Sequence, residues 1–174
     1  MVGLGGYAGL RLGEALALRW EDVDLEGGRL AVARSWSSRT KTFEKPKTGS
    51  GRRVVPIATE LRALLLAHRI ASGRRSGLVL GHDGLVPASS TGLRGRIYRT
   101  WKDAGLERLR FHDGRHSAVT AWLSGGAPVK VAQTIAGHAR ASITLDVYAH
   151  VLEGDLDVAT AAMARSVERA STRP

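Results

Sequence analysis

Near its N-terminus the chain reads Ala8-Gly-Leu-Arg-Leu-Gly-Glu-Ala-Leu-Ala-Leu-Arg-Trp-Glu-Asp-Val-Asp24. Apolar side chains recur in this stretch with helical spacing, which predicts a short amphipathic helix over residues 10–18. Arg11 and Glu14 are three positions apart and therefore share the polar side of this helix. The stretch thus predicts a helix that packs on a core through its leucines and presents one arginine and one glutamate together.

The segments that follow predict a mixed domain in which helices dominate. After a Gly-Gly turn, a strand is expected over residues 30–34, and a second one over residues 53–57, where Pro56 favours a sheet edge. Between them, residues 37–51 are polar and basic, as is typical of a loop or hairpin tip. The expected fold class is therefore α+β, mainly helical, with a small antiparallel β-sheet near the N-terminal third.

Five further helices are expected downstream, from capping residues and from apolar positions that recur every three or four residues. They are expected to begin near Thr59, near Ser89 or Ser90, near His112, near Val129 and near Ser142. Beyond them, an apolar stripe predicts a C-terminal helix that either packs on its own core or docks on a neighbouring molecule. The stripe comprises Leu156, Ala159, Met163 and Val167.

The chain is strongly basic. It has 26 lysines and arginines against 16 aspartates and glutamates, a net charge of +10, and its sequence pI is about 11.0. A positive field of this size attracts polyanions, so nucleic acid is the expected class of partner. The alternative is a surface whose charge only keeps the protein in solution.

Composition also excludes several classes of function. The 174 residues contain no cysteine, which excludes disulfides, thiolate metal sites and cysteine nucleophiles. The longest apolar stretch, at residues 64–67, is far too short to span a membrane. The first ten residues carry no basic cluster of the kind that opens a signal peptide. The chain is therefore expected to be soluble and cytoplasmic, without a membrane partner.

The N-terminal glycines resemble a dinucleotide-binding fingerprint, in the order Gly3-x-Gly5-x-x-Ala8. No strand is expected before them and no βαβ unit after them, and the fingerprint depends on both. The glycines therefore predict a flexible terminus and no nucleotide cofactor.

The segment His112-Asp-Gly-Arg-His116 places two histidines four positions apart, a spacing that binds zinc in helical zinc hydrolases. Three departures argue against a metal. Asp113 is shorter than the glutamate of that motif, Arg115 would set a fixed cation beside the metal, and Gly114 weakens the helix. No metal is expected here, and histidines that cap a helix would be the plain interpretation if the segment stood alone.

The segment does not stand alone, because further signatures accompany it in a fixed order. Arg11 lies in the opening stretch, and Lys47 lies in a Pro-Lys-Thr-Gly motif. His138 follows a glycine, and Tyr148 comes ten residues later. With these motifs in this order and spacing, the sequence resembles the tyrosine recombinase (phage integrase) family over residues 8–152. The resemblance implies the tyrosine recombinase catalytic-domain fold.

The resemblance implies site-specific DNA recombination or integration, in which strands are cleaved and rejoined through a 3′-phosphotyrosyl intermediate. Tyr148 would attack the phosphodiester. Arg11 and Arg115 would bind the phosphate through their forked donors, and His138 would donate a hydrogen bond to the same oxygens. His112 would accept the proton of the attacking tyrosine.

Two further residues complete the site that the resemblance implies. Glu14 matches the family's acidic residue one turn after Arg11, and is expected to orient an arginine or a histidine. Lys47 would protonate the departing 5′-oxygen, although Lys41 and Lys45 lie close enough to compete for that role. The phosphotyrosyl ester conserves the bond energy and the arginines stabilise the charge, so no ATP, metal or other cofactor is expected.

The resemblance also implies a domain organisation and an assembly. Residues 1–152 would form the catalytic domain, and residues 153–174 a C-terminal helix and tail that could dock on another protomer. Double-stranded DNA is the expected partner, bound by a homotetramer when the domain is part of a full-length enzyme. Only ten residues precede Arg11, so the family's N-terminal DNA-clamping domain is expected to be absent, as in an excised fragment or a truncated gene.

Two positions depart from the family pattern, because Gly114 and Ala136 stand where leucine is usual. Both departures predict a less rigid site. Besides a recombinase, two other functions remain open: a truncated, non-catalytic DNA-binding remnant of an integrase, and a relaxing enzyme similar to type IB topoisomerases. His138 and the compact Arg-Leu-Gly-Glu motif favour a recombinase over a topoisomerase.

Overall fold

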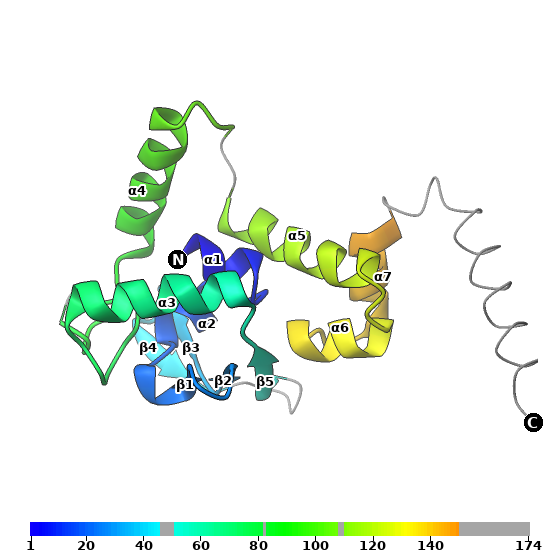
Figure 1. Cartoon of the computed structure of the whole chain (residues 1–174), viewed down its shortest axis with the longest axis horizontal. Helices are drawn as coiled ribbons and strands as arrows, with labels where there is room; N and C mark the ends of the chain where they lie inside the picture. Colours follow the sequence, from blue (N-terminus) through cyan, green and yellow to red (C-terminus); the bar gives the residue numbers. More distant parts are fainter. Residues whose placement is uncertain (46–50, 82, 108–109, 150–174) are drawn as a thin grey trace, which may run out of the picture.

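The computed structural model describes residues 1–45, 51–81, 83–107 and 110–149. Its helices are α1 (Val2–Gly6), α2 (Leu12–Ala17), the 3-10 turn η1 (Trp20–Asp22), α3 (Thr59–Ser72), α4 (Ser90–Asp103), α5 (Phe111–Ser124), α6 (Val129–Ala136) and α7 (Ala141–Ala149). Its strands are β1 (Val23–Asp24), β2 (Arg29–Val32), β3 (Ser35–Ser37), β4 (Thr42–Glu44) and β5 (Arg53–Pro56). The strands lie in the N-terminal third and helices predominate, so the expected α+β, mainly helical class is confirmed (Figure 1).

The strands form two small antiparallel sheets. In the first, with the order β1-β2-β5, Leu30 lies opposite Val55 and both side chains are buried. Pro56 lies on β5, an edge strand, as expected of a residue that cannot donate a backbone hydrogen bond. The second sheet is the β3–β4 hairpin, in which the rings of Trp36 and Phe43 pack 4.9 Å apart. In its described part, the segment expected as a loop or hairpin tip therefore includes the strand β4 and the last residue of β3.

The helix expected over residues 10–18 is present as α2, but it begins at Leu12, and a turn separates it from α1. Gly9 has a φ of +60° in that turn, and Arg11 has extended backbone dihedrals at the N-cap of α2. The backbone N–H of Arg11 donates to Oε2 of Glu14 over 2.7 Å, a capping contact that starts the helix after Arg11 rather than before it.

The expectation of a flexible glycine-rich terminus is also wrong, because α1 packs on α5. A Cβ atom at Gly5 would lie 3.1 Å from the carbonyl oxygen of Phe111, and one at Gly114 would lie 3.4 Å from the backbone nitrogen of Gly6. The absence of a side chain at Gly5 therefore lets the backbones of α1 and α5 approach closely. At Gly114 a Cβ atom would be in ordinary van der Waals contact with α1, which occupies the space beside the helix.

The buried apolar residues form two clusters. The larger joins α1, α2, the three-stranded sheet, α3 and the segment 78–80, and includes Leu10, Leu30 and Leu61. The smaller joins α5 and α6 around Val119 and Ala132, with Val147 of α7 packed against it. In Figure 1, α5 connects the two parts, with α1–α3 near its start and α6 and α7 near its end.

The fold also bears on the remaining sequence predictions. Helix α4 is capped as expected, since Oγ of Ser89 accepts the N–H of Gly92. In the ranges described above, no helix has the length and apolarity needed to cross a membrane. The apolar stripe predicted over residues 156–167 lies outside the described residues.

Candidate active site

A buried carboxylate joins the N-terminal helices to the sheet. Glu14 accepts Nη1 of Arg11 at 2.9 Å, and it accepts Nη1 and Nη2 of Arg53 at 2.9 and 2.8 Å. Burial by itself raises the pKa of Glu14, but the hydrogen bonds and positive charges of Arg53 and Arg11 outweigh it, so the pKa is lowered. The glutamate is therefore ionised at neutral pH, and it holds both guanidinium groups in place.

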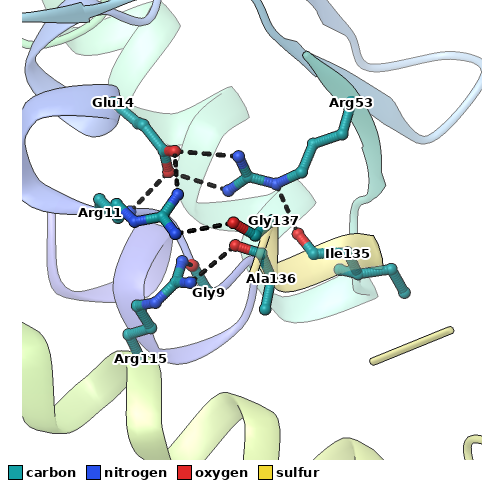
Figure 2. A network of polar contacts seen from close by, with 8 residues as sticks. All are labelled: Gly9, Arg11, Glu14, Arg53, Arg115, Ile135, Ala136 and Gly137. Atoms are coloured by element: carbon teal, nitrogen blue, oxygen red, sulfur yellow. Dashed lines mark hydrogen bonds and ion pairs between the residues drawn. The ribbon is translucent and has the colours of Figure 1, made fainter. Parts of the chain in front are cut away.

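Three arginines meet at the C-terminal end of α6 (Figure 2). Arg53 donates from Nε to the carbonyl of Ile135 at 2.6 Å, and Arg11 donates from Nη2 to that of Gly137 at 2.7 Å. The last carbonyls of a helix lack partners within the helix and carry its negative dipole end. Arginines are suited to that position because they supply both positive charge and several donors.

Arg115, on α5, completes this arrangement. Its Nη2 donates to the carbonyl of Ala136 at 2.7 Å, and its Nη1 donates to the carbonyl of Gly9. Only 3% of the residue is exposed. Burial, and then the charge of Arg11, lower the pKa of Arg115 to about 10, so it remains protonated at neutral pH. The three arginines come from α2, β5 and α5, so the end of α6 is held by three separate parts of the chain.

Sequence reasoning missed Arg53. The strand β5 alternates between buried and exposed positions, and Arg53 shares its buried face with Val55. The signal was therefore an arginine two residues before an apolar, inward-facing position of an alternating strand. Arg52 beside it is exposed, so residue type alone does not separate the two arginines.

His138 follows the capped end of α6 and is 7% exposed. Its Nδ1 lies 2.9 Å from Oγ1 of Thr144, and its carbonyl accepts Nε2 of Gln133 at 3.2 Å. Burial, followed by the charges of Arg115 and Arg11, lowers its pKa to about 4. The imidazole is therefore neutral at physiological pH.

Four of the six predicted catalytic residues line one pocket of about 200 Å³, namely Arg11, His112, Arg115 and His138. The other lining residues are His116, Val119, Ile143 and Val147. The pocket thus lies where α2, α5, the end of α6 and α7 come together. A group small enough to enter would meet two guanidinium groups and the imidazoles of three histidines.

His116 is a pocket residue that sequence reasoning had considered only as a zinc ligand or as a histidine that caps a helix. Its ring contacts that of His112 edge-on, with centroids 4.5 Å apart and an interplanar angle of 89°. Burial, and then the nearby His116 and Arg115, lower the pKa of His112, which favours its neutral form. Among the described residues, no group of three or more histidines, aspartates and glutamates is arranged to hold a metal ion.

Tyr148 belongs to α7, which packs on α5 and α6, and its neighbour Val147 lines the pocket. The tyrosine side chain lies outside what the structure describes, and so does Lys47. Of the two competing lysines, Lys45 lines an adjacent pocket together with Arg11 and Glu14. Lys41 occupies the β3–β4 turn with a φ of +53°.

Comparison with known proteins gives one consistent result. A sequence model described as "Phage integrase family" matches residues 1–154. A "Tyrosine recombinase XerC-like" protein of Caldanaerobacter subterraneus subsp. tengcongensis is 33% identical over 168 residues, covering 83% of this chain and 43% of the relative. The ICEBs1 integrase of Bacillus subtilis is 30% identical, covering 82% of this chain and 42% of the relative. The chain therefore spans less than half the length of these curated relatives.

Solved structures share the fold. The Tn1549 transposon integrase, solved in complex with circular intermediate DNA, superposes with a TM-score of 0.73 at 24% identity, over 94% of this chain and 58% of the other. The XerA recombinase superposes with a TM-score of 0.68 at 22% identity, over 99% and 57% of the two chains. The expected catalytic-domain fold is thereby confirmed.

Proposed function

The chain belongs to the phage integrase family, and we propose that it cleaves and rejoins DNA strands through a 3′-phosphotyrosyl intermediate with Tyr148 as the nucleophile. The observation that carries the proposal is the pocket in which Arg11, His112, Arg115 and His138 meet beside α7. Residues 1–152 would be the catalytic domain of a site-specific recombinase or integrase. As part of a full-length enzyme it would act as a homotetramer on double-stranded DNA.

The proposed phosphate ligands are Arg11, Arg115 and His138. A guanidinium has five N–H donors, and the contacts found among the described residues use one hydrogen on each terminal nitrogen of Arg11 and of Arg115. Further donors can therefore reach a phosphate while the carbonyls of α6 keep the guanidinium groups oriented. Such fixed donors stabilise the charge that builds on the non-bridging oxygens as phosphorus is attacked.

The proposed proton transfers use two different residues. As the phenol oxygen of Tyr148 bonds to phosphorus, its proton passes to His112, and the bond to the 5′-oxygen breaks with a proton supplied by Lys47. The lowered pKa of His112 keeps the ring neutral and able to accept a proton. The phosphodiester becomes a phosphotyrosyl ester of similar energy, and religation reverses the two transfers.

Double-stranded DNA is the proposed partner on three grounds. The net charge of +10 favours a polyanion. A second pocket, of about 400 Å³, lies beside the first, shares His112 with it, and is also lined by Arg94 and Arg110. The related Tn1549 integrase was solved with DNA.

The test is a nicked suicide DNA substrate, which traps a covalent protein–DNA complex because the short cleaved product diffuses away. We expect the chain to form the complex and Tyr148→Phe to form none. Tyr7→Phe is the matched control, since Tyr7 is exposed at the end of α1, and it should behave as the unaltered chain.

Two outcomes would overturn the proposal. A complex that persists in Tyr148→Phe would exclude this tyrosine as the nucleophile. DNA binding without any covalent complex, in both the unaltered chain and Tyr7→Phe, would favour the alternative of a non-catalytic DNA-binding remnant.

A further inference from the structure

A side chain to which no role has yet been given contacts the imidazole of His138. Thr144 is fully buried on α7, and its Oγ1 lies 2.9 Å from Nδ1 of His138. The backbone of His138 is held separately, since its carbonyl accepts Nε2 of Gln133. The ring and the main chain of this histidine are therefore fixed by different residues on two different helices.

The contact matters because the imidazole is neutral. A neutral imidazole carries one N–H, and the hydrogen bond made by one ring nitrogen determines where the proton lies. Burial, and then the charges of Arg115, Arg11 and Arg53, lower the pKa of His138, so the doubly protonated ring, which would donate from both nitrogens, is disfavoured. Whether the ring can donate to a phosphate thus depends on its tautomer.

We propose that Thr144 is a positioning residue that donates its hydroxyl hydrogen to Nδ1 of His138 and thereby keeps the ring proton on Nε2. That places the single N–H of the ring on the nitrogen that does not face Thr144. The inference rests on the proposed function for its purpose, which is a hydrogen bond from His138 to the DNA phosphate. The contact itself stands on the geometry of two buried side chains.

The position of Thr144 links this contact to the proposed nucleophile. Thr144 and Tyr148 are four residues apart on α7, so both positions lie on the same side of the helix. The packing of α7 on α5 and α6 thus places both the threonine hydroxyl beside His138 and the backbone of residue 148 near the pocket. The hydrogen-bond donor and the nucleophile are then set by the same helix.

The direct test measures the ring nitrogens of His138 by nitrogen-15 NMR in the full chain of 174 residues near pH 7, assigned with His138→Gln. We expect protonated Nε2 and unprotonated Nδ1 in the unaltered chain and in Thr144→Ser, which keeps the hydroxyl. Thr144→Val, similar in shape but without the hydroxyl, should populate both tautomers. Thr134→Val is the matched control, because its hydroxyl donates only to the carbonyl of Lys130 among the described residues.

Either of two NMR results would overturn the inference. A proton on Nδ1 of His138 in the unaltered chain would reverse the direction of the hydrogen bond, and this measurement does not depend on any variant folding. An unchanged tautomer in Thr144→Val would show that the hydroxyl does not select it.

The suicide substrate adds a functional measurement. Hydrogen-bond partners that orient metal-bound histidines contribute about 10–100-fold, and we expect Thr144→Val to slow covalent complex formation by a similar factor, with Thr144→Ser close to the unaltered chain. An unchanged rate in Thr144→Val would overturn the positioning role. If the unaltered chain forms no complex, the proposed function fails, while the NMR result still decides the tautomer.

Discussion

Two helix ends face the same pocket but are held in different ways. The C-terminal end of α6 is bound by Arg11, Arg53 and Arg115, whose carbonyl partners lie 126, 82 and 21 residues away in sequence. The N-terminal end of α5 is capped locally, since Arg110 pairs with Asp113 three residues later and both contacts are exposed. The end of α6 is bound by side chains from distant segments, whereas the start of α5 is capped within its own first turn and is also packed against α1.

The histidines at these two helix ends, His138 and His112, differ in burial and in the partners of their rings. His138, at the end of α6, is buried and its ring has a buried hydroxyl partner. His112, on the first turn of α5, is exposed and contacts His116 edge-on. In the proposed function His138 donates a hydrogen bond in one direction, and its buried partners favour a single orientation of the ring. In the same proposal His112 accepts and releases a proton, and its exposure allows exchange with solvent.

The largest expected effect comes from breaking the network at the end of α6. Arg53→Ala removes a buried partner of Glu14 and the donor to the carbonyl of Ile135. Breaking a buried ion pair by removing one partner costs about 3–5 kcal/mol, and we expect a loss of that size in the free energy of unfolding, measured by urea denaturation.

The neighbouring arginine provides the control. Arg52 is exposed, and surface substitutions usually change stability by less than about 0.5 kcal/mol. Equal losses for Arg52→Ala and Arg53→Ala would contradict the role given to Arg53.

The next effect is a pH dependence of stability from His138. Its pKa is about 4 in the folded chain against 6.5 ordinarily. Between pH 6.5 and pH 4 this histidine is therefore protonated in the unfolded chain but neutral in the folded chain. The contribution of the neutral His138 to the free energy of unfolding is therefore fully present above about pH 6.5. It declines by up to about 3 kcal/mol as the pH falls towards 4. Urea denaturation near pH 7 and near pH 4.5 should therefore show a smaller loss on acidification in His138→Gln than in the unaltered chain.

His112→Gln sharpens the contrast between the two histidines. The pKa of His112 is also lowered, but the ring is exposed. We expect this variant to lose nearly as much stability on acidification as the unaltered chain. If His138→Gln and His112→Gln changed the loss equally, burial would not separate the two residues as described.

The smallest expected effect is the difference in stability between alanine substitutions of the glycine at the end of α6 and of the glycine at the end of α3. Gly137 and Gly73 both cap their helices with positive φ, +67° and +64°. A Cβ atom at Gly137 would lie 2.7 Å from Nη1 of Arg53, whereas one at Gly73 would meet nothing within 4 Å.

Alanine at either position adopts a left-handed conformation at a cost of about 1–2 kcal/mol. Gly137→Ala also displaces the arginine, and crowding of this kind costs about 1–3 kcal/mol more. The difference between the free energies of unfolding of the two variants, obtained by urea denaturation, measures the cost of the contact between the new methyl group and Arg53. Equal losses of stability in Gly137→Ala and Gly73→Ala would mean that the side chain of Arg53 can move away from the added methyl group without an energetic cost.

Much of the fold was predictable from local patterns. The segment 53–57 was predicted as a strand and Pro56 predicted its edge position, and a capping serine predicted the start of α4. The start of α2 at Leu12 was not predicted, because continuous apolar spacing from Leu10 onward hides the capping contact between Arg11 and Glu14. A side chain that caps a helix and a side chain on its polar face have the same spacing in sequence.

The sequence by itself determined the residue types of the candidate site, because Arg11, His112, Arg115, His138 and Tyr148 lie in motifs whose order can be read along the chain. Only the tertiary structure decided how the site is held. Arg53 and the close approach of Gly5 to α5 depend on segments that are distant in sequence, and the contact of Thr144 with His138 depends on how α7 packs against the residues that follow α6. Local periodicity shows which side of a helix or strand is buried. It cannot show which carbonyl, hydroxyl or backbone will lie against that side, because those partners are brought there by the rest of the fold.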